Sequence, residues 1–171
     1  MVDQKDPSKN GNEKHDLQSE ISASQEEDAF ETASIKPKQV LVTDEFRYGY
    51  RITKFPGGGL QFGEGTIDCL KRECQEELGR DVDIREHFYT TDFFQRSAFN
   101  EKQQVISIYY FISMKDPQSI PVKKMPFDFD NEQEGAQIFR WLYLDSLSEN
   151  DFTFPIEKKV AERLRLKQMR K

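Results

Sequence analysis

Long apolar runs are missing from this sequence. No segment approaches the roughly 20 consecutive apolar residues of a membrane-spanning helix, and the first residues lack the apolar core of a secretory signal. We therefore expect neither a membrane protein nor a Sec-exported one. Cysteine is also scarce, since Cys69 and Cys74 are the only two. Their spacing matches neither a zinc-binding pair nor a disulfide framework, so we predict a reducing, cytoplasmic location.

Basic residues are fewer than acidic ones. The 171 residues include 25 Lys and Arg against 31 Asp and Glu, which gives a formal net charge of −6. The excess acid lies near the N-terminus, where residues 1–37 hold 9 of the acids and 4 of the bases. The remaining chain is nearly neutral and has no basic face, so a nucleic-acid polymer is not expected as a partner.

The sequence divides into an acidic tail at residues 1–36 and one domain at residues 37–171. Residues 1–35 are rich in Asp, Glu, Gln, Ser, Lys and Asn, contain one aromatic residue, Phe30, and show no sustained period. We expect this tail to be disordered. Hydrophobic segments begin at Gln39, and the aromatic residues, 12% of the chain, are sufficient for one core.

The domain alternates predicted strands and helices. Strands are expected at residues 40–42, 48–55, 82–84, 87–91, 105–114 and 139–144. Pro56 and the three glycines after it should break the second strand. A helix should run from Thr66, as N-cap, to Gly79, and a second helix from 156 to 169. Residues 115–135 form an irregular acidic connection. Strands on both sides of a buried helix predict an α/β domain with mixed strand pairing.

The first helix has an apolar stripe with acidic residues beside it. Ile67, Leu70, Cys74 and Leu78 recur at steps of three and four residues and form the stripe. The carboxylates are those of Glu73, Glu76 and Glu77, which fall within an arc of about 100°. Such close carboxylates repel one another unless a cation lies among them. Mg²⁺ is bound by a few carboxylates, with phosphates and water completing its shell. The helical period alone leaves a metal site and a solvated acidic face as alternatives.

Neighbouring residues favour the metal site. Glu64 precedes the helix and can join the acidic cluster, and Arg72 can pair with one carboxylate and fix its orientation. The glycine run Gly57–Gly59 lets the backbone approach a ligand closely and can offer a carbonyl group to a metal ion. No ordinary helix start requires such a run.

The segment Gly58–Arg80, GGLQFGEGTIDCLKRECQEELGR, resembles the 23-residue Nudix box, G-x5-E-x7-R-E-U-x-E-E-x-G-U, where U is apolar. Its fixed positions fall on Gly58, Glu64, Arg72, Glu73, Glu76, Glu77 and Gly79. Seven such positions match by chance in about one window in 10⁸ at ordinary composition. Cys74 is acceptable at the first U, whereas Arg80 departs from the second and Val82 is the candidate to supply its packing. The resemblance to the Nudix hydrolase family covers residues 37–166 and implies an α/β/α sandwich with a mixed β-sheet.

The resemblance also implies a reaction. Nudix hydrolases cleave a nucleoside diphosphate linked to another group (NDP-X) by attack of water on phosphorus, with Mg²⁺ as cofactor and Mn²⁺ as an alternative. Position by position, the implied metal ligands are the Gly58 carbonyl, Glu73, Glu76 and Glu77, while Arg72 orients a glutamate and Glu64 supports the cluster. The general base stays open between a box glutamate, Glu73 or Glu76, and the loop residues Glu132 and Glu134.

The substrate is left open by the sequence. The backbone of Gly57–Gly59 and the ring of Phe94 are candidate substrate contacts, although Phe93 and Phe94 are favoured as core residues. There is no proline about 15 residues past the box, as some ADP-ribose hydrolases carry, and NADH-type and coenzyme A-type signatures are absent. A catalytically silent nucleotide-sensing module is the main alternative, and an isopentenyl-diphosphate isomerase-like enzyme is disfavoured because both cysteines lie on the box helix. A homodimer is compatible with either function.

One feature departs from the family pattern. Relatives have a full strand well before the box, but residues 22–34, SASQEEDAFETAS, are polar. Either the first strand is poorly formed or the N-terminal segment is atypical for the fold.

Overall fold

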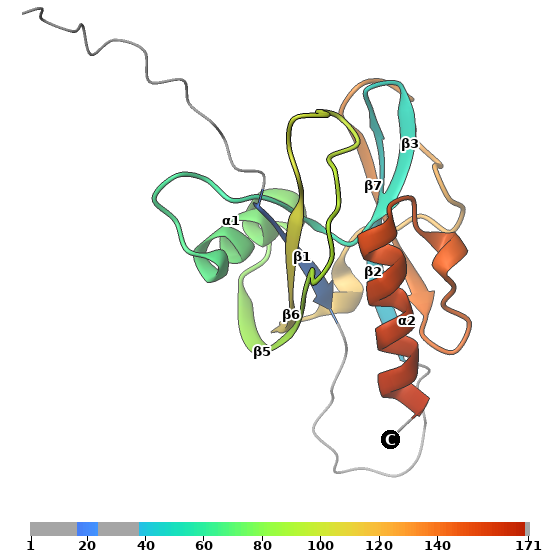
Figure 1. Cartoon of the computed structure of the whole chain (residues 1–171). Helices are drawn as coiled ribbons and strands as arrows, with labels where there is room; N and C mark the ends of the chain where they lie inside the picture. Colours follow the sequence, from blue (N-terminus) through green and yellow to red (C-terminus); the bar gives the residue numbers. More distant parts are fainter. Residues whose placement is uncertain (1–16, 24–37, 170–171) are drawn as a thin grey trace, which may run out of the picture.

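The computed structural model describes residues 17–23 and 38–169. Within these ranges the strands are β1 (Leu17–Ala23), β2 (Gln39–Arg47), β3 (Tyr50–Lys54), β4 (Gly57–Gly59), β5 (Val82–Thr90), β6 (Ile106–Met114) and β7 (Ala136–Tyr143). The helices are α1 (Thr66–Leu78) and α2 (Pro155–Met169). Short 3₁₀ turns lie at Pro117–Ser119, between β6 and β7, and at Glu149–Asp151, between β7 and α2. Figure 1 shows α1 and α2 well apart, with strands between them.

The described strands form two sheets. The larger has the order β4-β1-β6-β5, and the smaller has the order β3-β2-β7. Strand β1 runs parallel to β6 and antiparallel to β4, whereas the other pairs are antiparallel. The predicted mixed pairing is therefore confirmed.

Strand β1 corrects the expectation of a disordered tail for residues 17–23. These residues pair with β6 from Leu17 to Ala23 and with β4 from Gln18 to Glu20. An interior strand gains backbone hydrogen bonds on both edges, so it can form even where its sequence lacks the apolar pattern typical of a strand. The rest of the predicted tail, residues 1–16 and 24–36, lies outside the described residues.

Other strand predictions differ from the structure in their bounds, and two differ in the number of strands. The glycines Gly57–Gly59 do not simply interrupt the chain, because they form β4 and pair with β1. Glycine is rare in strands because it has no side chain to pack. A strand made of glycines is therefore not recognised from amino-acid composition. The two strands predicted at residues 82–84 and 87–91 are one strand, β5, which ends at Thr90 and whose pairing with β6 is irregular between Ile84 and Tyr89.

Two clusters of buried side chains lie on opposite faces of the sheets. On β2, Val40 and Val42 belong to the cluster that packs against α2, while Leu41 belongs to the cluster that packs against α1. Tyr109 and Ile112 divide β6 in the same way. Alternate strand residues point to opposite faces. The result is a helix layer on each side of the strands, as the predicted α/β/α sandwich requires.

The N-cap of helix α1 lies one residue earlier than the predicted Thr66. Its N-cap is Gly65, whose N–H donates to the Asp68 carboxylate at 3.3 Å, while the Thr66 hydroxyl shares a hydrogen bond with the Tyr110 hydroxyl at 2.8 Å. Gly79 ends the helix with a φ of 62°, as predicted.

The buried face of α1 is also displaced from the predicted stripe. Cys69, Leu70 and Cys74 are buried, while Ile67 is 44% exposed. Cys69 is buried because its thiol lies against β4, 3.6 Å from the Gly59 carbonyl oxygen. In the part of the chain described here, the helices lack the length and apolar character needed to cross a membrane.

Candidate active site

Strand β4 and helix α1 place the predicted glycines and glutamates side by side. A Cβ atom built on Gly58 would lie 2.3 Å from Cδ and 2.4 Å from both carboxylate oxygens of Glu73. Only glycine leaves room for this contact without moving the carboxylate. The Glu73 carboxylate therefore lies directly on the Gly58 backbone, and two of the predicted oxygen ligands come from adjacent elements.

Arg72 is the centre of the acidic cluster. Its Nη2 and Nε donate to the two oxygens of Glu64 at 2.7 and 3.1 Å, and its Nη1 donates to Glu73 at 2.5 Å and Glu76 at 3.1 Å. Nη2 also donates to the Gly59 carbonyl at 3.1 Å. The predicted pairing with one carboxylate is thus a contact with three, and the same guanidinium ties the helix to β4.

Charge pairing shifts the pKa values of Glu64 and Arg72 in opposite directions. The hydrogen bonds from Arg72 lower the pKa of Glu64 to about 2, despite an opposing contribution from burial. The same bonds, those to Glu64 foremost, raise the pKa of Arg72 above its ordinary value. Glu64 accordingly remains a carboxylate under all ordinary conditions and serves as the fixed counterion of Arg72.

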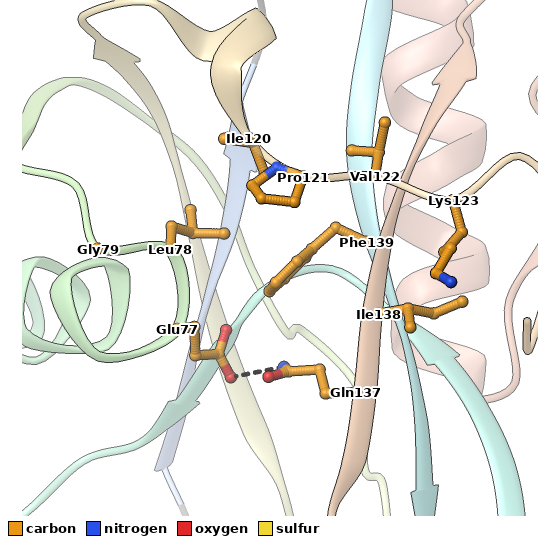
Figure 2. A pocket seen from close by; sticks show the side chains of 10 residues that line it. All are labelled: Glu77, Leu78, Gly79, Ile120, Pro121, Val122, Lys123, Gln137, Ile138 and Phe139. Atoms are coloured by element: carbon orange, nitrogen blue, oxygen red, sulfur yellow. Dashed lines mark hydrogen bonds between the residues drawn. The ribbon is translucent and has the colours of Figure 1, made fainter. Parts of the chain in front are cut away.

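Glu77 faces away from Arg72 and toward the strands. One of its oxygens accepts the Gly57 N–H at 3.2 Å, and the other accepts the Gln137 amide at 3.1 Å, as Figure 2 shows for Gln137. Burial raises the pKa of Glu77, and the nearby Lys54 ammonium opposes that rise. The carboxylate is held between β4 and β7, apart from the contacts of Arg72.

A pocket of about 480 Å³ opens beside Glu77 (Figure 2). Its apolar wall includes Leu78, Ile120, Pro121 and Phe139. Polar groups enter from Glu77, Gln137 and Lys123. The space is thus continuous with the acidic helix and large enough for an organic ligand.

Residues 32–164 match the NUDIX domain family. This range covers more than half of the chain. The chain belongs to the Nudix family. The resemblance carried by the sequence from Gly58 to Arg80 is therefore confirmed.

One curated relative is the 8-oxo-dGTP diphosphatase of Buchnera aphidicola subsp. Acyrthosiphon pisum (strain APS), which is 31% identical over 81 residues. The match covers 47% of this Nudix chain and 60% of that relative. The chain thus spans less than two thirds of the relative's length.

Solved structures share the Nudix fold. A NUDIX hydrolase from Nitrosomonas europaea superposes with a TM-score of 0.60 at 16% identity and covers 90% of both chains. A C. elegans Ap4A hydrolase binary complex superposes with a TM-score of 0.62 at 12% identity, covering 91% of this chain and 99% of that one. At these identities the similarity establishes the fold alone.

The Nudix box has a donor set that suits a divalent cation. Nudix enzymes generally use such ions, and hard cations prefer carboxylate and carbonyl oxygens. The close contact of Glu73 with the Gly58 backbone places such donors together. Among the residues that the structure describes, no three acidic, Cys or His side chains converge as a metal-binding group. The Arg72 guanidinium binds Glu64, Glu73 and Glu76 instead.

The acidic loop residues lie at the β2–β3 hairpin. The carboxylate of Glu134 accepts the Tyr48 N–H at 2.8 and 3.1 Å, and Glu132 pairs with Arg51 at 2.6 Å. Tyr48 has a positive φ of 53°, so the Glu134 contact secures a tight turn. Neither loop carboxylate is brought into contact with the box glutamates in the described residues. Their assignment as base or extra ligand stays a prediction.

The expectation that Phe93 and Phe94 fill the core is wrong. They are 39% and 73% exposed. Both follow the end of β5 at Thr90, where the chain leaves the sheet, and Tyr89 supplies the buried ring of that strand at 4% exposure. Phe94 is consequently available as a stacking surface.

Three residues around Glu77 were missed by the sequence analysis. Glu45, Lys54 and Gln137 come from β2, β3 and β7, and their meeting depends on strand pairing, which the sequence does not state. One indication was present. Glu45 has the same strand parity as the buried Leu41, so a charged residue was pointing toward the core.

Proposed function

We propose that this Nudix domain hydrolyses the diphosphate linkage of a nucleoside diphosphate derivative, NDP-X, and releases two phosphorylated products. The observation that carries the proposal is the contact between the Glu73 carboxylate and the Gly58 backbone, beside Arg72 and its three carboxylate partners. A merely solvated acidic helix has no reason to hold a carboxylate where any side chain at position 58 would displace it. Family membership supports the same chemistry.

The proposed ligands of Mg²⁺, with Mn²⁺ as a substitute, are the Gly58 carbonyl and the carboxylates of Glu73, Glu76 and Glu77. A divalent cation, when bound, supplies positive charge that neutralises a diphosphate and favours attack by water. Arg72 keeps Glu73 and Glu76 oriented, with Glu64 as its fixed counterion.

Proton transfer and substrate contacts fall to other groups of the chain. A carboxylate of the box, Glu73 or Glu76, or of the loop, Glu132 or Glu134, accepts the proton of the attacking water. The backbone of Gly57–Gly59 approaches the phosphates, and the exposed ring of Phe94 stacks on the nucleobase. The proposed setting is the cytoplasm, with a nucleotide-type small molecule as the partner and a homodimer as the assembly to test.

The test is a substrate screen in the presence of Mg²⁺ or Mn²⁺. The panel contains nucleoside triphosphates, including 8-oxo-dGTP, dinucleoside polyphosphates such as Ap4A, and nucleotide sugars, with released phosphate species resolved by chromatography. Glu76→Gln is the matched inactive control. We expect cation-dependent cleavage of at least one class. Tight nucleotide binding without turnover of any member would support the silent sensing module instead.

A further inference from the structure

Glu77 belongs to a hydrogen-bond network that extends beyond the Nudix box. The Gln137 amide donates to Glu77 at 3.1 Å and to Glu45 at 3.4 Å. The Lys54 ammonium lies 3.2 Å from the same Glu45 oxygen and donates to the Gly57 carbonyl at 2.6 Å. The Gly57 N–H closes the ring by donating to Glu77 at 3.2 Å. The ring thus joins helix α1 to four strands, and Glu77 itself contacts two of them, β4 and β7.

Strand register creates this ring. Glu45 pairs directly with Gln137, and Thr43 pairs with Lys54. Paired residues project to the same face, and this is the face of Leu41, which packs in the cluster against α1. A slip of one residue in β7 would turn the Gln137 amide to the opposite face. Gln137 therefore reaches Glu77, and Glu45 and Lys54 join the network behind it, because of the register of the whole smaller sheet.

The charges and donors of this network are suited to holding the Glu77 carboxylate in one orientation. The Glu45 side chain is 5% exposed and the Lys54 side chain 15% exposed, so both charges lie largely out of water. A buried charge is stable only when it is paired and hydrogen-bonded. The Glu45–Lys54 pair meets this condition. The Gln137 amide then bridges the carboxylates of Glu45 and Glu77. Each oxygen of Glu77 receives one donor, which fixes the plane of the carboxylate.

We propose that Glu45, Lys54 and Gln137 are positioning residues for the cation site, and that they act through Glu77 and the Gly57 backbone. The inference rests on the proposed function, since Glu77 matters as a ligand only if the site binds a divalent cation. Gln137 sets the orientation of the Glu77 carboxylate, and Lys54 holds β4 at its distance from the helix. Partners of this kind typically change metal affinity or activity by roughly 10–100-fold when they are replaced.

The test is Mn²⁺ binding to the full chain without substrate, measured from the electron paramagnetic resonance signal of free Mn²⁺. Gln137→Leu removes the shared donor at similar size. The double variant Glu45→Gln/Lys54→Met removes both charges of this ion pair together, so neither of its members is left buried without the other. We expect the dissociation constant for Mn²⁺ to rise about 10–100-fold in each. Substrate KM at saturating cation should change little, which a general loss of packing would not produce.

Two matched controls accompany these variants. Arg47→Met removes a cation that lies 3.2 Å from the other oxygen of Glu45, is 54% exposed and contacts neither Glu77 nor Gly57. Lys54→Arg keeps the positive charge. Both should bind Mn²⁺ within roughly twofold of the wild type, below the effect of a lost orienting partner. Thermal melts without cation verify that every variant is folded.

The outcomes separate the two claims. Wild-type affinity in both Gln137→Leu and the double variant, with intact binding by the unaltered chain, overturns the positioning network and leaves the proposed function standing. An unaltered chain that binds no Mn²⁺ overturns the cation site and the network with it. Equal losses in Arg47→Met and Gln137→Leu also overturn the inference, because the effect would then be general.

Discussion

Arg72 grips Glu64 through two parallel hydrogen bonds, from Nη2 to Oε1 at 2.7 Å and from Nε to Oε2 at 3.1 Å. This fork holds the loop before α1 against the helix itself. Bidentate Arg–carboxylate pairs are both directional and charge-assisted. The pair therefore fixes the segment of the Nudix box that leads into helix α1 before any cation or substrate is present.

This pair predicts a specific dependence of stability on pH. Hydrogen bonds from Arg72 lower the pKa of Glu64 from 4.5 to about 2 in the folded state. A lowered folded-state pKa contributes stability above the unfolded pKa, and that contribution is lost as pH falls through the folded pKa. Urea unfolding without divalent cation should show this loss between about pH 4.5 and 2. Glu64→Gln should flatten that part of the curve, and an unchanged slope would contradict the prediction.

Glutamate and leucine substitutions on α1 should separate chemistry from folding. Glu76→Gln or Glu77→Gln keeps the shape but removes a negative ligand, and we expect turnover to fall by at least roughly 10²-fold. Substitution of Leu70, which is fully buried, should instead lower stability and spare turnover. Leu70→Ala should cost about 2–5 kcal/mol of stability through a cavity while the folded fraction stays active. Melts and Mg²⁺ titrations of activity on the same preparations check both. Near-normal turnover in the glutamate variants would contradict the cation site.

Glu77→Gln should also change how the melting temperature depends on the cation. Burial raises the folded-state pKa of Glu77, so its ionised form opposes folding, and the stability it contributes is present below the unfolded pKa and lost as pH rises through the folded pKa. At neutral pH without cation, the variant should melt at or above the wild-type temperature. Added Mg²⁺ should raise the melting temperature of the wild type more than that of the variant. A variant that is less stable without cation would count against this account.

Removal of β1 should destabilise the domain. A chain that starts at Lys36 lacks the strand that pairs with both β4 and β6, and β4 carries Gly58 of the site. We expect a lower melting temperature and weaker activity. A chain that starts at Leu17 is the matched control, because it keeps β1, and it should behave as the full chain does. Equal stability of the two shortened chains would show that β1 is dispensable.

Chelation gives the simplest chemical test. Exhaustive treatment with EDTA should abolish hydrolysis, and added Mg²⁺ or Mn²⁺ should restore it, because the glutamates alone cannot neutralise a diphosphate. The helical content by circular dichroism should stay constant throughout. Turnover that survives chelation would remove the cation from the mechanism.

The box could be predicted from sequence because its residues are local. The spacing from Arg72 to Gly79 fixes which side chains share a helix face, and Gly79 ends the helix as its type requires. Leu41 and Val42 were recognisable as strand residues for the same reason. These predictions depend on a few consecutive residues and on one regular period.

The remaining features depend on contacts between distant segments. Strand β1 is polar, and β4 is three glycines, so neither has the composition of a strand; each forms because the other and β6 supply hydrogen bonds. Gln137 reaches Glu77 only after β7 pairs with β2 in one register. Phe94 was misplaced because composition does not reveal where a chain leaves a sheet.

The contact between Gly58 and Glu73 has a consequence for the natural variation that this gene can tolerate. The backbone at Gly58 is not in the left-handed region, so alanine is conformationally allowed there. The atoms that a methyl group would strike belong to the far end of the flexible Glu73 side chain, which can swing aside. We therefore expect a Gly58→Ala variant to fold with the Glu73 carboxylate displaced from the Gly58 backbone and from Arg72. Such a variant should lose hydrolysis while keeping its melting temperature, so a measurement of folded protein alone would not detect the loss.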